Sequence, residues 1–442
     1  MTNGQNGKNS LIVEQKNPKK FLFVSWESLS GDLAWQIKKE GYEVKIYIKA
    51  EADKDVYDGF LDKVDDWKQF VDWADVIVFD DTGFGKEADS LRKSGKLVIG
   101  GSQYTDKLEE DREFGQSEMS RVGMLTLPHW DFSDYDLALK FIEENPGRYV
   151  YKPSGFIASD YKGLLFLGKD EDGKDLHEII RSNKEVLKKK VRQFQLQKFA
   201  QGVEIAVGAF FNGNDFIYPI NVNFEHKKLF PGDIGPFVGD MGALMYWSQP
   251  NTMFKTTLEK MKEDIKKSGY VGYIDINCIA NARGIYPLEF TSRFGYPTIS
   301  VQEEGAISEW GNFLCSIAKG ENFDLKTKKG FQIGVICLVP PFPYEDKSEI
   351  AIYKDLSIIF KKPGFDGIHL GDVKLIEGNW RIAGDTGYAL VVTGSGTTVE
   401  DARRQAYNRI ENILLQNMFY RTDIGLGWYE DSDKLQTWGY LY

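Results

Sequence analysis

Short apolar runs alternate with amphipathic segments over residues 20–104, a pattern typical of a parallel α/β sheet. The first turn of this region, residues 25–31, reads SWESLSG and lacks the Gly-x-Gly-x-x-Gly that holds a dinucleotide pyrophosphate. The sequence therefore predicts a Rossmann-like N-terminal domain and argues against a dehydrogenase. Its predicted strands lie at 21–24, 44–48, 74–79 and 96–100, with helices at 32–39 and 88–93.

The middle of the chain mixes helices with strands. Ser133 and Asp136 resemble a capping box, and the basic run 184–192 reads as a helix with a solvated face. Residues 218–242 are rich in glycine and acids, so we expect a long functional loop there. A helix is expected at 255–267. Strands are predicted at 149–152, 163–167, 194–199 and 204–211.

After about residue 324 the pattern changes to short strands and one helix that starts at a capping box, Thr398. This predicts a separate small α+β domain, and we expect an α/β and α+β multidomain fold overall. The predicted organisation is a flexible tail at 1–18, the Rossmann-like domain at 19–104, a central domain at 105–326 with a lid at about 148–205, the C-terminal domain at 327–426 and a tail at 427–442.

Residues 269–298 form the most informative stretch, because two short strands joined by a turn carry acids at their ends. Asp275 and Glu289 are expected near facing positions of this hairpin, with Arg293 just beyond it. Carboxylate oxygens suit a hard dication such as Mg²⁺, and an arginine stabilises charge on a transferring phosphoryl group. From these residues alone, a salt-bridged surface hairpin is an equally good interpretation.

The composition narrows the class of protein. The formal charge is 55 − 66 = −11, which disfavours a nucleic-acid partner. No apolar run approaches the ~20 residues of a membrane span, and we expect no membrane association. The three cysteines are scattered and show no Cys–His zinc spacing. These features indicate a cytoplasmic, multidomain α/β enzyme.

Three segments, in this order along the chain, resemble the ATP-grasp enzymes and specifically the phosphoribosylamine–glycine ligase family. They are HKK with GDIGP and GDMGA within 226–243, LEFTSRFGYP at 288–297, and TVEDA, AY and YRTDIG within 398–425. The resemblance extends from about residue 20 to 428. It implies a Rossmann-like domain, a two-part ATP-grasp region and a C-terminal domain.

The resemblance also implies which residues bind ATP. Lys152 matches a lysine that reaches the α- and β-phosphates, and the loop 155–163 corresponds to a glycine-rich flap in which Lys162 takes a catalytic position. Residues 197–199 correspond to the family's adenine-binding hinge, and Glu204 matches a carboxylate that meets the ribose hydroxyls. An ordinary solvated hairpin is the alternative for the flap. The residues expected to bind ATP are Arg112, Lys152, Gly155, Lys162, Gln197, Lys198, Phe199 and Glu204.

For the metal, Glu289 matches a magnesium-binding glutamate, whereas Thr291 replaces the usual asparagine. Asp275 lies fourteen residues before Glu289, where many ATP-grasp enzymes place a first ligand, and is expected to compensate. ATP and Mg²⁺, with Mn²⁺ as an alternative, are the implied cofactors. The implied substrate-binding residues are Asp233, Gly235, Pro236, Asp240, Met241, Gly242 and Arg293, of which Arg293 is also catalytic.

The implied reaction joins a carboxylate to an amine through an acyl phosphate. However, the first turn lacks the arginine and histidine of the family, and the glycine-rich segment departs from its pattern at 237–240. Two enzymes therefore fit: a divergent phosphoribosylamine–glycine ligase, or an ATP-grasp ligase that joins an amino acid to a different amine. A non-catalytic nucleotide-binding relative is the third alternative. The expected partners are small-molecule amino acid and amine substrates, with the protein a monomer or homodimer.

Overall fold

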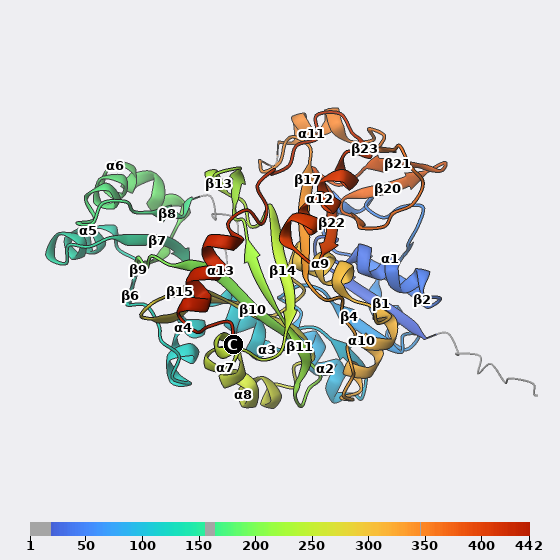
Figure 1. The fold of residues 1–442 in the computed structure, drawn as a ribbon, viewed down its shortest axis with the longest axis horizontal. Helices are drawn as coiled ribbons and strands as arrows, with labels where there is room; N and C mark the ends of the chain where they lie inside the picture. Colours follow the sequence, from blue (N-terminus) through green and yellow to red (C-terminus); the bar gives the residue numbers. More distant parts are fainter. Residues whose placement is uncertain (1–18, 155–163, 345) are drawn as a thin grey trace, which may run out of the picture.

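The computed structural model describes residues 19–154, 164–344 and 346–442 (Figure 1). The predicted N-terminal tail and the predicted flap, including Gly155 and Lys162, lie outside these residues. Among the described helices, none is long and apolar enough to cross a membrane. The structure confirms the predicted fold class, a mixed α/β and α+β architecture that begins with a parallel sheet.

The N-terminal sheet is parallel, in the order β3-β2-β1-β4-β5. Its strands read as apolar runs because helices cover both faces. The strand order reverses beside β1, so the loops after β1 and β4 border the crevice in which such sheets bind ligands. The elements are β1 (Lys20–Ser25), α1 (Gly31–Lys39), β2 (Glu43–Ile48), β3 (Asp62–Lys63), β4 (Val76–Phe79), α2 (Gly85–Lys93) and β5 (Leu97–Ile99).

Two helices then lead into a small lid, which projects to the left in Figure 1. The lid is a four-stranded sheet in the order β6-β9-β7-β8, with a hydrophobic core of its own. Its first helix is capped by Asp134 rather than by the predicted Ser133. The elements are α3 (Gln103–Glu110), α4 (Arg112–Arg121), β6 (His129–Phe132), α5 (Tyr135–Glu144), β7 (Tyr149–Ser154), β8 (Phe166–Leu167), α6 (Lys174–Lys190) and β9 (Gln193–Lys198).

An eight-stranded antiparallel sheet forms the centre of the molecule, in the order β16-β15-β10-β11-β14-β17-β22-β19. Helices α7 and α8 replace the single helix predicted at 255–267, because the backbone leaves the helical region at Thr257. The elements are β10 (Val203–Phe211), β11 (Phe216–Glu225), β14 (Gly242–Ser248), α7 (Thr252–Thr256), α8 (Lys262–Lys267), β15 (Gly272–Asn281), β16 (Gly284–Thr291), α9 (Thr298–Gly305) and α10 (Trp310–Ala318).

The glycine-rich segment is more ordered than the predicted loop. Strand β11 continues to Glu225, and a two-stranded hairpin, β12 (Lys228–Phe230) with β13 (Ile234–Phe237), precedes β14. A side chain at Gly242 would lie 2.5 Å from the carbonyl oxygen of Gly334, so the start of β14 requires glycine. The acids and glycines here form a surface hairpin beside the sheet.

The C-terminal strands extend the central sheet, because β17 pairs with β14. The predicted boundary at residue 326 thus falls within one continuous sheet, and the domain limits stay a prediction. Residues 427–442, predicted as a tail, contain a helix whose Trp428 packs on Phe224, Tyr246 and Phe331. The elements are β17 (Phe331–Leu338), α11 (Lys347–Tyr353), β18 (Ile359–Phe360), β19 (Ile368–Leu370), β20 (Val373–Ile376), β21 (Asn379–Ile382), β22 (Tyr388–Gly396), α12 (Val399–Ile410), β23 (Ile413–Leu414) and α13 (Trp428–Thr437).

Candidate active site

The β15–β16 hairpin brings four oxygen-bearing side chains to one face of the central sheet. Asp275 pairs with Thr291, and Asn277 pairs with Glu289. Because side chains two residues apart lie on the same face of a strand, all four lie together. Asp275 and Glu289 are therefore diagonal neighbours in the hairpin.

Two of these side chains carry a buried oxygen without a partner. Among the described residues, neither Oδ1 of Asp275 nor Oδ1 of Asn277 accepts a hydrogen bond. Burial, followed by the nearby Glu225, raises the pKa of Asp275 to about 8, although hydrogen bonds with Tyr273 and Thr291 oppose the shift. Unpaired hard oxygens on one face match the donors that Mg²⁺ prefers.

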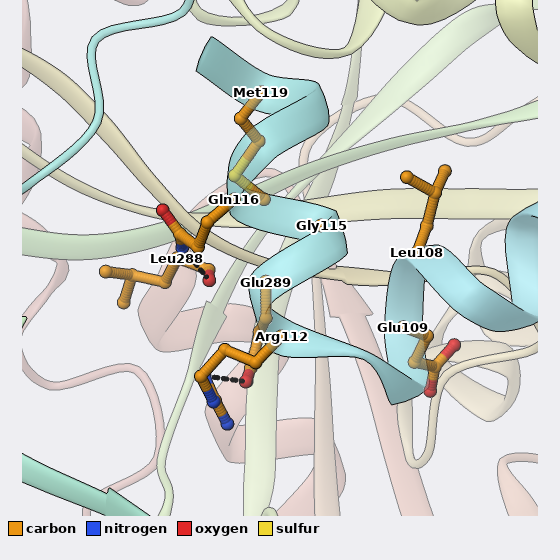
Figure 2. Close-up of a pocket in the computed structure, with 8 residues that line it drawn as sticks. All are labelled: Leu108, Glu109, Arg112, Gly115, Gln116, Met119, Leu288 and Glu289. Carbon is orange, nitrogen blue, oxygen red and sulfur yellow. Dashed lines mark hydrogen bonds and ion pairs between the residues drawn. The ribbon is translucent and has the colours of Figure 1, made fainter. Parts of the chain in front are cut away.

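Three cations and several acids converge beside this face. Nη1 of Arg112, the first residue of α4, lies 3.7 Å from Glu289 Oε2. Figure 2 marks this ion pair with a dashed line. Lys227, in the turn after β11, lies 2.9 Å from Glu204 and 3.7 Å from Glu289. Lys152 comes from β7 of the lid. The lid, α4 and the central sheet thus each contribute to one charge cluster.

Lys152 is the most perturbed of these cations. It is 7% exposed, and burial, followed by repulsion from Arg112, lowers the pKa of its ammonium to about 7. Glu289 and Glu204 act in the opposite direction. A bound polyanion such as a triphosphate would stabilise the charged form of a buried lysine that lies among other cations.

The predicted adenine hinge divides between the two faces of the lid sheet. Gln197 is buried on the face of Lys152, and its Nε2 has no partner among the described residues. Lys198 lies on the opposite face, with its ammonium 4.3 Å from the ring centre of Tyr149. The backbone N–H groups of Lys198 and Phe199 donate hydrogen bonds to the carbonyl oxygens of Pro128 and Arg148. Gln197 is thus the hinge side chain that faces the charge cluster.

Arg293 is held by two acids that lie outside the β15–β16 hairpin. Its Nε is 3.2 Å from Glu109 Oε1 and 3.6 Å from Asp81 Oδ1. Glu109 also accepts the backbone N–H of Ser292 at 2.6 Å. These contacts fix the chain just after β16 against α3 and β4.

The predicted substrate residues of the glycine-rich segment are mostly engaged elsewhere. Asp233 forms an ion pair of 2.8 Å with Arg421, and Met241 is fully buried in a hydrophobic cluster. Asp240 accepts the N–H groups of His226 and Gly242, while burial and Glu225 raise its pKa well above the usual value. Gly235 and Pro236 lie on β13, and Gly242 begins β14. The structure therefore places Met241 in the core and not at the site.

Sequence reasoning missed three residues of the charge cluster: Glu225, Lys227 and Asn277. Lys227 stood in the HKK motif, which was the available signal for it. Asn277 was visible as the residue two after Asp275 on the same strand face. Glu225 had no signal, because its role depends on where β11 ends.

Comparison with known proteins finds similar sequences. Residues 110–299 match the ATP-grasp (A) domain of phosphoribosylglycinamide synthetase. The chain is 26% identical over 348 residues to the phosphoribosylamine–glycine ligase of Streptococcus pneumoniae, covering 76% of this chain and 80% of that one. The Clostridium acetobutylicum protein of the same name is 24% identical over 380 residues, covering 81% and 87%.

Solved structures share the fold. Phosphoribosylamine–glycine ligase from Thermotoga maritima superposes with a TM-score of 0.70 at 22% identity, covering 92% of this chain and 100% of that one. Biotin carboxylase from Campylobacter jejuni gives 0.63 at 15% identity, covering 95% and 96%. The protein therefore has the ATP-grasp fold. Its sequence is similar to the phosphoribosylamine–glycine ligases, at about a quarter identity over most of their length.

Proposed function

We propose that the protein is an ATP-dependent carboxylate–amine ligase that forms an amide and releases ADP and phosphate. One observation carries the proposal: Lys152, Arg112 and Lys227 converge on Glu289, beside the oxygens of the β15–β16 hairpin. Cations around a hard-oxygen face suit a metal-bound triphosphate. The names of the relatives and the matched ATP-grasp domain support the same class of reaction.

The donor set fits a divalent metal. Asp275, Asn277, Glu289 and Thr291 would hold it, since all four offer oxygen and two have an unpaired buried atom. When bound, Mg²⁺ or Mn²⁺ would neutralise charge on the transferring phosphoryl group. Asn277 supplies the amide oxygen that Thr291 cannot.

The reaction then needs positioning more than covalent chemistry. A substrate carboxylate oxygen attacks the γ-phosphorus of ATP, the bond to the β-phosphate oxygen breaks, and ADP leaves an acyl phosphate. The amine nitrogen attacks the acyl carbon, phosphate departs and the nitrogen loses its proton. Lys152 and Arg112 hold phosphate charge, and Gln197 offers a buried N–H toward the nucleotide.

Coupled ADP release tests the proposal directly. The purified protein with MgATP should release ADP only when both an amino acid, glycine first, and an amine are present, and mass spectrometry should find the amide. ADP release that ignores either substrate would contradict the ligase. Nucleotide binding without turnover for any pair of substrates would favour a non-catalytic relative.

A different amine acceptor is the second candidate. The turn after β1 offers Glu27, Ser28 and Leu29 to the crevice at the carboxyl end of the parallel sheet. An acid at that turn disfavours a phosphorylated substrate. Phosphoribosylamine should therefore be compared directly with other amines in the same assay.

A further inference from the structure

A cavity of about 190 Å³ lies at the carboxyl end of β1, outside the charge cluster described above. The turn after β1, helices α1 and α9, and strands β19 and β22 enclose it. Tyr296, which lines the cavity, follows Gly295, where an added Cβ would lie 3.8 Å from Asp275 Oδ2. The cavity thus adjoins the metal-binding face through a single short loop.

Acidic side chains dominate the ionisable groups of this cavity: Glu27, Asp32, Glu303 and Asp372. Among the described residues that line it there is no lysine or arginine, and His369 is the one basic group. The ring nitrogens of His369 lie 2.7 Å from Asp32 Oδ2 and 3.0 Å from the Thr393 hydroxyl. A phosphate dianion would therefore meet four acidic side chains and, among the described lining residues, no lysine or arginine.

Three buried polar groups in the cavity lack a partner. Within the described part of the chain, Oε1 of Glu303 and the hydroxyls of Tyr296 and Tyr388 form no hydrogen bond. The side chain of Glu303 is 6% exposed, and burial, followed by repulsion from Asp32, raises its pKa well above the usual value. Leaving such groups unpaired is costly, so they point to a ligand that donates hydrogen bonds.

The other polar groups of the cavity are already satisfied. Asp32 accepts the backbone N–H of Leu370 as well as contacting His369, and Asp372 accepts the hydroxyls of Ser28 and Thr386. Asp80 accepts both the backbone N–H and the hydroxyl of Ser30, next to the first turn of α1. A carboxylate therefore already occupies the helix end at which a phosphate would otherwise bind.

We propose that this cavity binds the acceptor amine, and that the acceptor is a small ammonium compound with an apolar body and no phosphate. The inference rests on the proposed ligase function and names its second substrate. Glu303 accepts the ammonium N–H, while the rings of Tyr296 and Tyr388 face the cation. The apolar wall comes from Leu29, Leu33, Ile299 and Phe342. The volume is below the ~300–1,000 Å³ of drug-sized pockets, which limits the acceptor to a small molecule.

Calorimetric titration of the full chain tests the charge preference. Phenethylamine and phenylacetate share an aromatic body and differ in charge, and ribose 5-phosphate represents the sugar phosphates. We expect phenethylamine to bind at least tenfold more tightly than either anion. Tighter binding of ribose 5-phosphate would overturn the inference.

Substitution of Glu303 tests the location. Glu303→Gln should weaken phenethylamine at least tenfold, whereas Glu321→Gln, on the exposed surface, should leave the affinity within twofold. A thermal melt of each variant confirms that both are folded. Amine binding that Glu303→Gln leaves unchanged would overturn the inference. So would Zn²⁺ that binds tightly and displaces no amine, because Asp32, Glu303 and His369 would then serve as a metal site.

Measurement of ADP release distinguishes a failure of the cavity assignment from a failure of the proposed ligase function. Turnover with phosphoribosylamine that Glu303→Gln leaves unchanged overturns the cavity assignment and supports the ligase. Phenethylamine binding that depends on Glu303, with no ADP release for any amine, supports a cationic ligand for the cavity and contradicts the proposed ligase function.

Discussion

The charge cluster at the β15–β16 hairpin and the cavity at the end of β1 differ in the balance of their acidic and basic side chains. In the cluster, Lys227 lies within 3.7 Å of both Glu204 and Glu289, and Arg112 also contacts Glu289. In the cavity, four acids meet no lysine or arginine among the described lining residues. Balanced charge suits a polyanion that arrives with a metal, whereas unbalanced negative charge selects a cation.

Helix α9 shows the same contrast in two adjacent residues. Glu304 lies 2.9 Å from Arg409 and 3.0 Å from Lys328, while Glu303 lines the cavity with an unpaired oxygen. Adjacent residues on a helix face different directions, so one element serves both the core and the cavity. Pairing at Glu304 stabilises the fold. At Glu303, Oε2 lies 4.0 Å from His369 Nδ1, and only the unpaired Oε1 is left for a ligand.

The largest expected effect comes from substitution of Lys152 in the lid. Lys152→Met should lower the rate of ADP release by about 10²–10³-fold, because a buried cation at the proposed triphosphate site would be lost. Lys198→Met is the matched control, since its ammonium lies over Tyr149 on the other lid face. It should retain activity within about threefold. Similar losses for both variants would show that the lid merely needs its lysines to fold.

The next largest effect is on stability, and it has opposite signs for the adjacent residues Glu303 and Glu304. Burial raises the pKa of Glu304, but Arg409, Ser395 and Lys328 together lower it from 4.5 to about 2. A shift of this size stabilises the folded state by about 3 kcal/mol above pH 4.5, and that stability is lost as the pH falls toward 2. Glu304→Gln should therefore lower the free energy of unfolding at pH 7 and flatten its acid dependence.

Glu303 should behave in the reverse manner, because its folded-state pKa is raised. Its contribution is present below pH 4.5 and is lost as the pH rises through the folded pKa. Glu303→Gln should thus raise Tm at pH 7, in thermal melts recorded beside those of Glu304→Gln. Equal decreases in Tm for the two variants would contradict the contrast along α9.

The sequence predicted the parallel sheet and the β15–β16 hairpin because both depend on local pattern, whereas the role of Lys152 in ATP binding stays a prediction from the resemblance. It did not predict that β17 extends the central sheet or that α13 packs through Trp428, because long-range pairing leaves no local periodicity. The position of Glu225 in the charge cluster and the existence of the cavity were not predicted, for the same reason. The cavity is assembled from segments hundreds of residues apart, such as Ser28 with Asp372.

The proposed metal-binding face of the β15–β16 hairpin should give a smaller effect than Lys152. Asp275→Asn should raise the Mg²⁺ concentration required for half-maximal ADP release by about 10–100-fold, because the amide lacks the negative charge of the carboxylate. Asn277→Asp, which adds a carboxylate to the same strand face, should restore part of the affinity in the double variant. Unchanged magnesium dependence of Asp275→Asn would remove Asp275 from the metal site.

The smallest effect concerns two tyrosines of the cavity whose hydroxyl groups differ in hydrogen bonding. The Tyr57 hydroxyl donates a hydrogen bond to the carbonyl of Ser28, while the buried Tyr388 hydroxyl has no partner within the described residues. Tyr57→Phe should lower the free energy of unfolding by about 1 kcal/mol, the net value of a typical hydrogen bond. Tyr388→Phe should leave it unchanged or raise it, because an unsatisfied group is removed. An amine bound in contact with the Tyr388 hydroxyl gives the wild type a hydrogen-bond partner that Tyr388→Phe lacks. Saturating phenethylamine should therefore reduce the difference in Tm between Tyr388→Phe and the wild type.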